Sequence, residues 1–266
     1  MSNAAGAAAH IRLIEELADR DTVLHRRHPA THLGVTLGYA VLVASFDKYA
    51  LSALLPMILY PVFVLSLGEI PLSALLRRIV PVMPLLLAFG IFNPVFDRQV
   101  WILWDFPMSA GWLSMLSFLL RGILAVGVAV SLLAIIGTNG LSQALRTLRV
   151  PRLLIMQLLL TFRYLQVLAE EVQRMALAYH LRAPEQRGIA FQQWGSLAGQ
   201  WLLRTLQRAQ RLHQAMLCRG FRGDFPSAET PRFTIIDAGY LGGWIAFFIL
   251  VRFVNLPLWL GSLFVH

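Results

Sequence analysis

The amino-acid sequence predicts an all-α, polytopic membrane protein with about five transmembrane helices and long cytoplasmic helices. Of its 266 residues, 57% are hydrophobic and only 14% are charged, and the mean hydropathy is positive. A soluble domain carries about 25% charged residues, so this chain is too apolar for that class. Its apolar residues also gather in runs that approach or exceed the roughly 17 residues needed to cross a bilayer.

The net charge of +9 comes from one segment. Residues 141–222 hold 12 Arg and 3 Glu, and the rest of the chain holds 11 basic and 11 acidic residues. Basic clusters beside spanning helices mark the cytoplasmic side of a membrane, so we expect this segment inside the cell and no nucleic-acid partner. Cys218 is the single cysteine, which excludes an internal disulfide framework.

Taken in order, residues 1–32 are expected to form an amphipathic cytoplasmic or interfacial segment without a cleavable signal peptide. Residues 33–137 are expected to form a bundle of four spans. Its first two apolar runs, Leu33–Phe46 and Leu51–Leu67, are separated by Asp47 and Lys48. Both runs are near or below the usual length of a span, so one long bent element is the alternative.

The chain should then return to the cytoplasm over Gly68–Ile79, which carries Arg77 and Arg78, before a third span, Val80–Phe96, that contains Pro81 and Pro84. A loop follows over Asp97–Gly111. Its tryptophans and the one just after it fit the aromatic belt at a bilayer surface; they are Trp101, Trp104 and Trp112.

The fourth predicted span is Trp112–Gly137, and the fifth, Asp237–Leu263, lies in the C-terminal segment 236–266. With the N-terminus inside, five crossings place Asp47, Lys48, the tryptophan loop and His266 outside and the basic segment inside. Arg121 and Arg252 interrupt these two spans. Ionisable residues within spans are functional-site candidates, and the alternative is that both snorkel or face a protein partner.

Residues 138–235 are expected to form a cytoplasmic segment with two long helices. Its first apolar stretch, Leu153–Phe162, is too short to span a membrane. From there a polar face recurs at helical spacing, comprising Arg163, Val167, Glu170 or Glu171, Arg174, Ala178 and Arg182. After a loop over Pro184–Gly195, a second helix from Ser196 spans on the order of 36 Å to Arg219. One of its sides carries Arg204, Arg208 and Arg211.

Both helices end in a similar pattern, an Ala four residues before an Arg that a small residue follows. The first is Ala178 to Ala183 around Arg182, and the second is Ala215 to Gly220 around Arg219. Pro184 and Gly220 should stop the helices so that each Arg lies in a last turn. Such an Arg complements the helix dipole and presents a planar fork of donors to a partner's groove. Simple solvation or attraction to anionic lipid is the alternative.

The run Ala-Met-Leu-Cys-Arg-Gly-Phe at Ala215–Phe221, with Gly223 shortly after, closely resembles the second Ala-Arg-Gly signature of the T component of energy-coupling factor (ECF) transporters, particularly the cobalt-transport CbiQ form. The layout of spans and cytoplasmic helices is similar to that family from about His25. The first copy departs from the pattern, because Ala183 stands where the family usually has Gly or Ser.

The resemblance implies a membrane coupling subunit of an importer in the cell inner membrane, carrying cobalt or nickel ions. Two ATP-binding cassette ATPase subunits would receive the two helix ends, and their motion would pass to a separate membrane-embedded substrate-binding (S) subunit. The implied coupling residues are Ala178, Arg182, Ala183, Ala215, Arg219, Gly220 and Phe221. Of the two tips, we expect Arg219 to be the more deeply seated. A vitamin importer with a similar T component is the alternative.

The chain itself shows no nucleotide or cofactor site. Its only lysine, Lys48, lies outside any glycine-rich phosphate loop, so the energy must come from a partner. His25, His28 and His32 are a metal-site candidate, but Pro29 breaks their helical spacing, the site is expected in the cytoplasm, and no nearby carboxylate or thiol completes a ligand shell. An interfacial polar cluster is the favoured interpretation.

Three more residues that could bind a metal or react lie near the two motifs. His180 and His213 are expected to be interface or solvated residues, and Cys218 a small packing residue. An enzyme acting on lipid would need paired acidic residues, whereas those of this chain are scattered. A passive membrane scaffold is the remaining possibility.

Overall fold

The computed structural model describes residues 22, 24–49, 51–96, 100–103, 106–183, 188–223 and 233–253. These residues form two compact units, one of residues 22–144 with 233–253 and the other of residues 145–223. The predicted lead-in before residue 22, Trp104, Pro184 and the part of the fifth predicted span beyond Phe253 lie outside the described residues. Each unit is described by itself.

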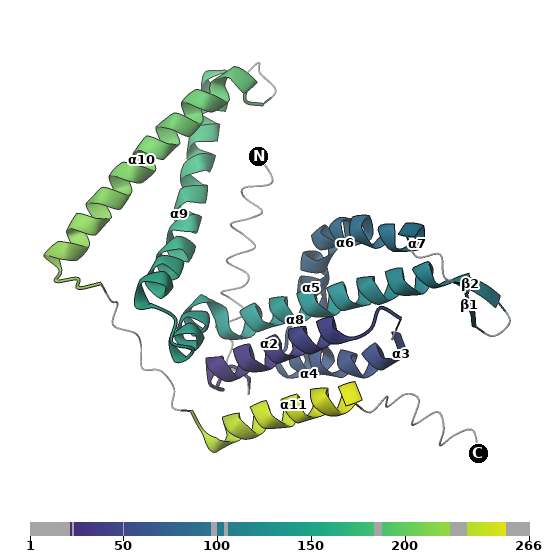
Figure 1. Ribbon diagram of the computed structural model, residues 1–266. Coiled ribbons are helices and arrows are strands. Elements are labelled where there is room, and N and C mark those ends of the chain that lie inside the picture. Colours follow the sequence, from purple (N-terminus) through teal and green to yellow (C-terminus); the bar gives the residue numbers. More distant parts are fainter. Residues whose placement is uncertain are drawn as a thin grey trace. The chain divides into compact units, whose positions relative to one another are not determined.

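The first unit begins with two helical elements that double back on each other (Figure 1). Helix α2 is Pro29–Ser45, and α3 (Leu51–Leu54), the 3₁₀ turn η1 (Leu55–Ile58) and α4 (Leu59–Leu67) follow without a break. Tyr39 Oη on α2 donates to the carbonyl of Met57 on η1 at 3.1 Å. This contact requires the chain to reverse at residues 46–50, so the alternative of one long bent element is wrong.

The third helical stretch starts earlier than predicted. It consists of α5 (Leu72–Ile79), the 3₁₀ turn η2 (Val80–Val82), α6 (Met83–Gly90) and α7 (Phe92–Phe96). The predicted start was Val80, because Arg77 and Arg78 were assigned to the polar connection. Proline is tolerated in the first turn of a helix, and the stretch restarts at Pro81 and at Pro84.

Two short strands occupy the region predicted as an irregular tryptophan loop. Strand β1 (Val100–Leu103) pairs antiparallel with β2 (Phe106–Ser109), with Val100 opposite Ser109 and Leu103 opposite Phe106. Valine, tryptophan and isoleucine, which fill the first three positions of β1, are residues that favour strands. These two segments are therefore strands where the sequence predicted a loop. Trp101, one of the predicted loop's tryptophans, lies in β1.

Helix α8 (Ala110–Thr147) contains a break at the residue where the sequence predicted the fourth span to end. Gly137 has φ 60° and ψ −172°, a backbone conformation that is essentially restricted to glycine. The helical part from Ala110 up to this break therefore matches the predicted span Trp112–Gly137. The residues after Gly137 return to helix up to Thr147.

Helix α11 (Ile235–Phe253) runs parallel to α2, while α8 runs antiparallel to both. At one end, the backbone N–H of His28 lies 3.4 Å from Asp237 Oδ1, and Gly140 faces Pro29. At the opposite end, Arg252 Nη2 reaches the carbonyl of Ser45 at 3.0 Å, and Arg121 reaches that of Asp47. This alternation agrees with the predicted order of crossings, in which the first and fifth spans begin on one side and the fourth begins on the other.

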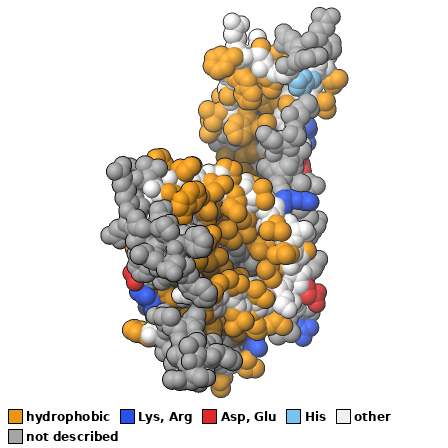
Figure 2. All heavy atoms as spheres, turned by 90° about the vertical axis from the view of Figure 1, so that its right-hand side faces the viewer, with side chains coloured by type: hydrophobic (Ala, Val, Ile, Leu, Met, Phe, Trp, Pro, Cys, Tyr) orange, Lys and Arg blue, Asp and Glu red, His pale blue; other side chains and the backbone are white. Residues whose placement is uncertain are grey.

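An aromatic cluster forms the core of this unit. Tyr39 of α2 and Tyr60 of α4 have ring centroids 5.2 Å apart, and both contact Phe248 of α11 at 5.4 Å. By contrast, large apolar side chains of α4 and α6 face outward, including Leu59, Leu85 and Phe89 at 55%, 58% and 60% exposure. Hydrophobic side chains also dominate the described part of the face seen in Figure 2. An apolar core and an apolar surface together are typical of a bundle solvated by lipid.

Four helical stretches of the described chain are long and apolar enough to cross a membrane, and Leu51–Leu67 is a shorter apolar stretch. The four are Leu72–Pro94, Gly111–Thr147, Arg152–Arg182 and Ile235–Phe253. The all-α, multi-pass prediction is thus confirmed. The stretch Arg152–Arg182 differs from expectation. Its apolar part, Leu153–Phe162, is too short to span a membrane, but the helix continues beyond it through charged residues to Arg182. Its cytoplasmic location stays a prediction.

The second unit contains α9 (Arg152–Arg182) and α10 (Phe191–Cys218), an antiparallel helical hairpin whose helices meet at the end of α9 and diverge away from it (Figure 1). Helix α10 begins five residues before the predicted Ser196. The predicted loop included Gly195, but a glycine inside a helix costs only about 1 kcal/mol relative to alanine and does not end this one.

Candidate functional site

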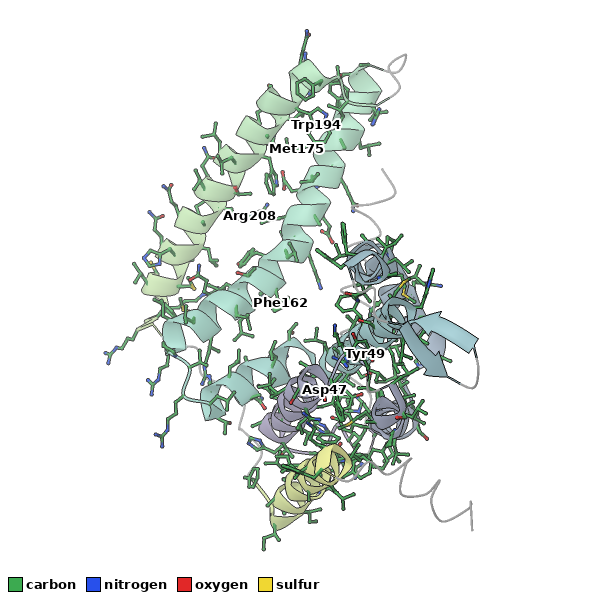
Figure 3. The ribbon with its side chains drawn as sticks, turned by 45° about the vertical axis from the view of Figure 1, so that its right-hand side comes forward. Asp47, Tyr49, Phe162, Met175, Trp194 and Arg208 are labelled. Atoms are coloured by element: carbon green, nitrogen blue, oxygen red, sulfur yellow. The ribbon has the colours of Figure 1, made fainter. Side chains whose placement is uncertain are left out.

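A carboxylate on α9 binds arginines of both helices of the α9–α10 hairpin. Glu171 accepts hydrogen bonds from Arg204 at 3.1 Å and from Arg208 at 3.3 Å, both on α10, and from Arg174 of its own helix at 3.3 Å. Its side chain is 14% exposed. Met175 and Arg208 lie on the sides of the helices that face each other (Figure 3). Charge-assisted contacts of this kind set how the two helices lie against one another.

The first predicted tip lies at the last helical residue of α9. Arg182 is exposed, as predicted, and Ala183 follows it as the C-cap with φ −132° and ψ 67°. The N–H of Ala183 donates to the carbonyl of Tyr179 at 3.0 Å. Because this cap keeps a negative φ, it does not require glycine. The helix end thus explains how the chain tolerates Ala183 at this position.

The second tip ends differently. Arg219 is the C-cap of α10, one residue beyond the last turn in which it was predicted, and Gly220 has φ +77°. The N–H of Phe221 donates to Met216 at 3.0 Å and that of Gly220 to Leu217 at 3.0 Å, which is the Schellman arrangement. Only glycine adopts this left-handed position without strain. The small residue after Arg219 is therefore needed for the cap, and Arg219 is held at its exposed end.

The two arginines lie at opposite ends of α10. Arg182 lies beside the start of α10, where it lines the same cavity as Gln193 and Ser196, whereas Arg219 caps its far end. At 1.5 Å per residue, the 28 residues of α10 separate the two tips by about 42 Å. One hairpin thus presents two cationic helix ends to two separate places.

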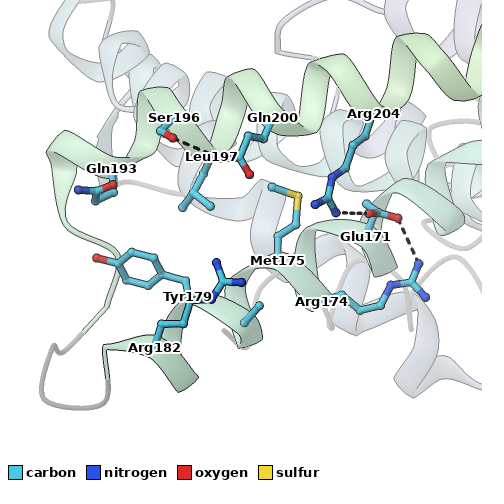
Figure 4. Close-up of a pocket in the computed structure, with 11 residues that line it drawn as sticks. Glu171, Arg174, Met175, Tyr179, Arg182, Gln193, Ser196, Leu197, Gln200 and Arg204 are labelled. Carbon is cyan, nitrogen blue, oxygen red and sulfur yellow. Dashed lines mark hydrogen bonds and ion pairs between the residues drawn. The ribbon is translucent and has the colours of Figure 1, made fainter.

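A cavity of about 310 Å³ opens between the helices next to the first tip (Figure 4). Its walls include Glu171, Arg174, Arg182 and Arg204, together with Ala178 of the first motif. The lining combines one carboxylate with three guanidinium groups and suits an acidic partner group better than a cation. Arg182 therefore lies in a positively charged groove, while Arg219 lies on an open helix end.

Residues 20–231 match the family model of CbiQ, described as cobalt transport protein. The match covers most of the 266 residues and both tips. The chain belongs to the CbiQ family. CbiQ proteins are non-catalytic membrane components of cobalt and ECF transport, which excludes the lipid-processing enzyme considered above. No curated protein matches this chain.

The match to the CbiQ family makes the chain a member of an ECF transporter complex and a multi-pass membrane protein. It also accounts for the resemblance carried by Ala215–Phe221. The matched range begins before α2 and ends before α11, so it includes the whole α9–α10 hairpin.

The two arginines within the predicted spans converge on one turn of this CbiQ protein. Arg121 on α8 donates to the carbonyl of Asp47, just after α2, and Arg252 on α11 donates to that of Ser45, the last residue of α2. The Arg252 guanidinium also lies 5.1 Å from the centre of the Phe46 ring. These contacts satisfy carbonyls that a helix C-terminus leaves without partners. They assign both arginines a structural contact that the sequence did not reveal.

The histidine cluster does not form a metal site in the part of the chain that the structure describes, where no group of three or more His, Cys, Asp or Glu could hold an ion. His28 caps α2 by accepting from the N–H of Ala30 at 3.2 Å, and His32 Nε2 pairs with the carbonyl of Leu24 at 3.0 Å. Contrary to expectation, a carboxylate does lie beside them. It is Asp237, which accepts from the N–H of Thr234 at 3.0 Å.

The remaining candidates lie on the hairpin. His180 is half-buried beside the ring of Tyr179, whereas His213 and Cys218 are exposed. The structure also selects Glu171 from the two adjacent glutamates that the sequence left open. Arg174 gave no signal for this choice, because it lies at a pairing distance of three residues from Glu171 and of four residues from Glu170.

Proposed function

We propose that this chain is the coupling (T) subunit of an ECF-type importer for cobalt or nickel ions in the cell inner membrane. Its α9–α10 hairpin docks onto two ATP-binding cassette ATPase subunits, one through Arg182 and one through Arg219. When the ATPases close on ATP, the two tips move, and the hairpin passes this motion to a separate membrane-embedded substrate-binding subunit. The N-terminus and the hairpin lie in the cytoplasm.

The placement of the two tips at opposite ends of α10 carries this proposal. Two ends about 42 Å apart can engage two ATPase subunits at once, whereas two adjacent arginines would engage one. Each end pairs an exposed guanidinium with small neighbours, Ala178 and Ala183 at the first and Ala215 and Gly220 at the second. A guanidinium fork binds carboxylates in two-point geometry, which gives a docking contact direction as well as affinity.

The transported ion is assigned from the cobalt description of the family, and a vitamin is the alternative substrate. The family is non-catalytic and lies in the membrane, which supports a role in transmitting energy that partner subunits supply. Arg219 is proposed as the dominant contact because its cap is fixed by Gly220, whereas Arg182 lies in the groove beside Glu171.

Reconstitution of the chain with both ATPase subunits and the substrate-binding subunit tests the proposal. We expect Arg219→Glu to reduce ATP-driven cobalt uptake and ATPase copurification at least tenfold, and Arg182→Glu to have a smaller effect. Arg211→Glu is the matched control, since Arg211 is exposed on α10 between the tips. Unchanged uptake and association in the Arg182→Glu, Arg219→Glu double variant would contradict the proposal. Competition by nickel, but not by vitamins, would support the ion.

A further inference from the structure

A second cavity lies in the membrane unit, where the chain enters α2. It has a volume of about 330 Å³ and lies between residues 24–29 and residues 135–143 of α8, on both sides of the break at Gly137. His25, Arg26 and Arg27 line one side, and Ile135 and Ile136 line another. The cavity thus combines a basic wall with an apolar wall, and it shares no lining residue with the cavity beside Arg182.

The backbone of α8 shapes this cavity. The glycine-specific break at Gly137 lies immediately after Ile136, and Gly140 lies against the start of α2. A methyl group at Gly140 would be 3.6 Å from Pro29, so the two helices approach closely there. Breaking α8 next to this approach leaves space beside the contact.

The charged side chains among the described residues that line the cavity are basic. Among the described residues that line it, none is acidic, and Arg26 is exposed. The nearest acidic contact is Asp237, which lies 3.9 Å from Arg27 and also accepts from the backbone N–H groups of His28 and Thr234. This buried carboxylate therefore lies beside Arg27. The N-terminal end of α2 adds the partial positive charge of a helix start.

We propose that this cavity binds the phosphate of an anionic phospholipid headgroup. Arg26 and Arg27 donate to the phosphate oxygens, and Ile135 and Ile136 contact the glycerol and the first acyl carbons. Basic pockets between membrane helices are suited to such headgroups. A lipid is favoured over free phosphate because the wall opposite the arginines is apolar and the surrounding bundle exposes apolar side chains, among them Leu37 and Val41 of α2 at 51% and 67%.

Native mass spectrometry tests this site. The full chain is released from nanodiscs of phosphatidylcholine that contain one fifth phosphatidylglycerol, which gives a charge density on the order of the physiological one. We expect one phosphatidylglycerol to be retained per chain, and expect Arg26→Gln, Arg27→Gln to reduce its occupancy at least fivefold. Because Arg27 also contacts Asp237, Arg26→Gln alone is the second variant, with an expected loss of phosphatidylglycerol occupancy of at least twofold.

Arg77→Gln, Arg78→Gln on α5 is the matched control, because it removes the same charge from another helix of this unit. An equal loss in this control would mean general charge attraction and would overturn the site. Inorganic phosphate is the second probe. If it raised the Tm as much as phosphatidylglycerol does, the lipid would be the wrong source, and unchanged lipid occupancy in Arg26→Gln would overturn the proposal altogether.

Discussion

Glu171 on α9 accepts a hydrogen bond from Arg204 on α10 at 3.1 Å, across 33 residues of sequence. The same carboxylate also meets Arg174 and Arg208, so one side chain joins both helices of the hairpin. Because the two proposed docking tips lie on these helices, the contact at Glu171 controls the geometry in which both tips reach their partners. A hairpin that transmits motion needs such a defined geometry.

We predict that Glu171→Gln loosens the hairpin. The amide keeps the size of the side chain but loses the charge that attracts three guanidinium groups. Spin labels on cysteines that replace the exposed Leu177 and Gln210, in a Cys218→Ser background, report the distance between the helices. The distance distribution should widen in Glu171→Gln and stay unchanged in His213→Gln, at an exposed position of α10. Equal widths in the parent chain and Glu171→Gln would refute the prediction.

We predict that Arg252 and Arg121 stabilise the bundle and do not take part in ion passage. Arg252→Leu removes the donor to the carbonyl of Ser45, and the loss of such a hydrogen bond costs about 0.5–1.5 kcal/mol. The Tm in detergent should fall, and Arg252→Lys should restore part of it by retaining a donor. Arg121→Leu should behave in the same way through Asp47. A normal Tm with lost cobalt uptake would instead place these residues on the transport route.

We predict that His32 supports structure and not metal binding. His32 is 2% exposed and pairs with the carbonyl of Leu24, so His32→Leu leaves that carbonyl unpaired at a cost of about 1–3 kcal/mol. Thermal unfolding should show a lower Tm, whereas calorimetric titration of the purified chain with Co²⁺ should match the parent. His213→Leu, at an exposed position, serves as the control. Loss of a Co²⁺ signal in His32→Leu alone would revive the metal site.

The sequence predicted those features that depend on local chemistry. Hydrophobic runs identified the membrane class, Gly137 marked the end of a span, and Gly220 marked the end of α10, because each of these glycines has a backbone conformation that other residues avoid. The repeated pattern of an Ala four residues before an Arg also located both helix ends. These signals lie within a few neighbouring residues and need no knowledge of tertiary contacts.

Features that depend on distant contacts could not be predicted. The choice between Glu170 and Glu171 depends on which side of α9 faces α10, and the carboxylate beside His28 comes from Asp237, which is 209 residues away. Arg121 and Arg252 belong to different helices, so their meeting at one turn becomes visible only when α8 and α11 pack beside α2. The two strands were not predicted, because the tryptophans of this region were interpreted as residues at a membrane surface and not as strand residues.

Labelling of Cys218 tests the central claim most directly. This single cysteine is exposed beside Arg219, so it reports on the second tip without any engineered residue. We predict that a maleimide reagent modifies Cys218 readily in the isolated chain and at least tenfold more slowly once both ATPase subunits are bound. Arg219→Glu should restore fast modification in the same mixture. Equal rates of modification in the isolated chain and in the assembled transporter would contradict the docking of this tip.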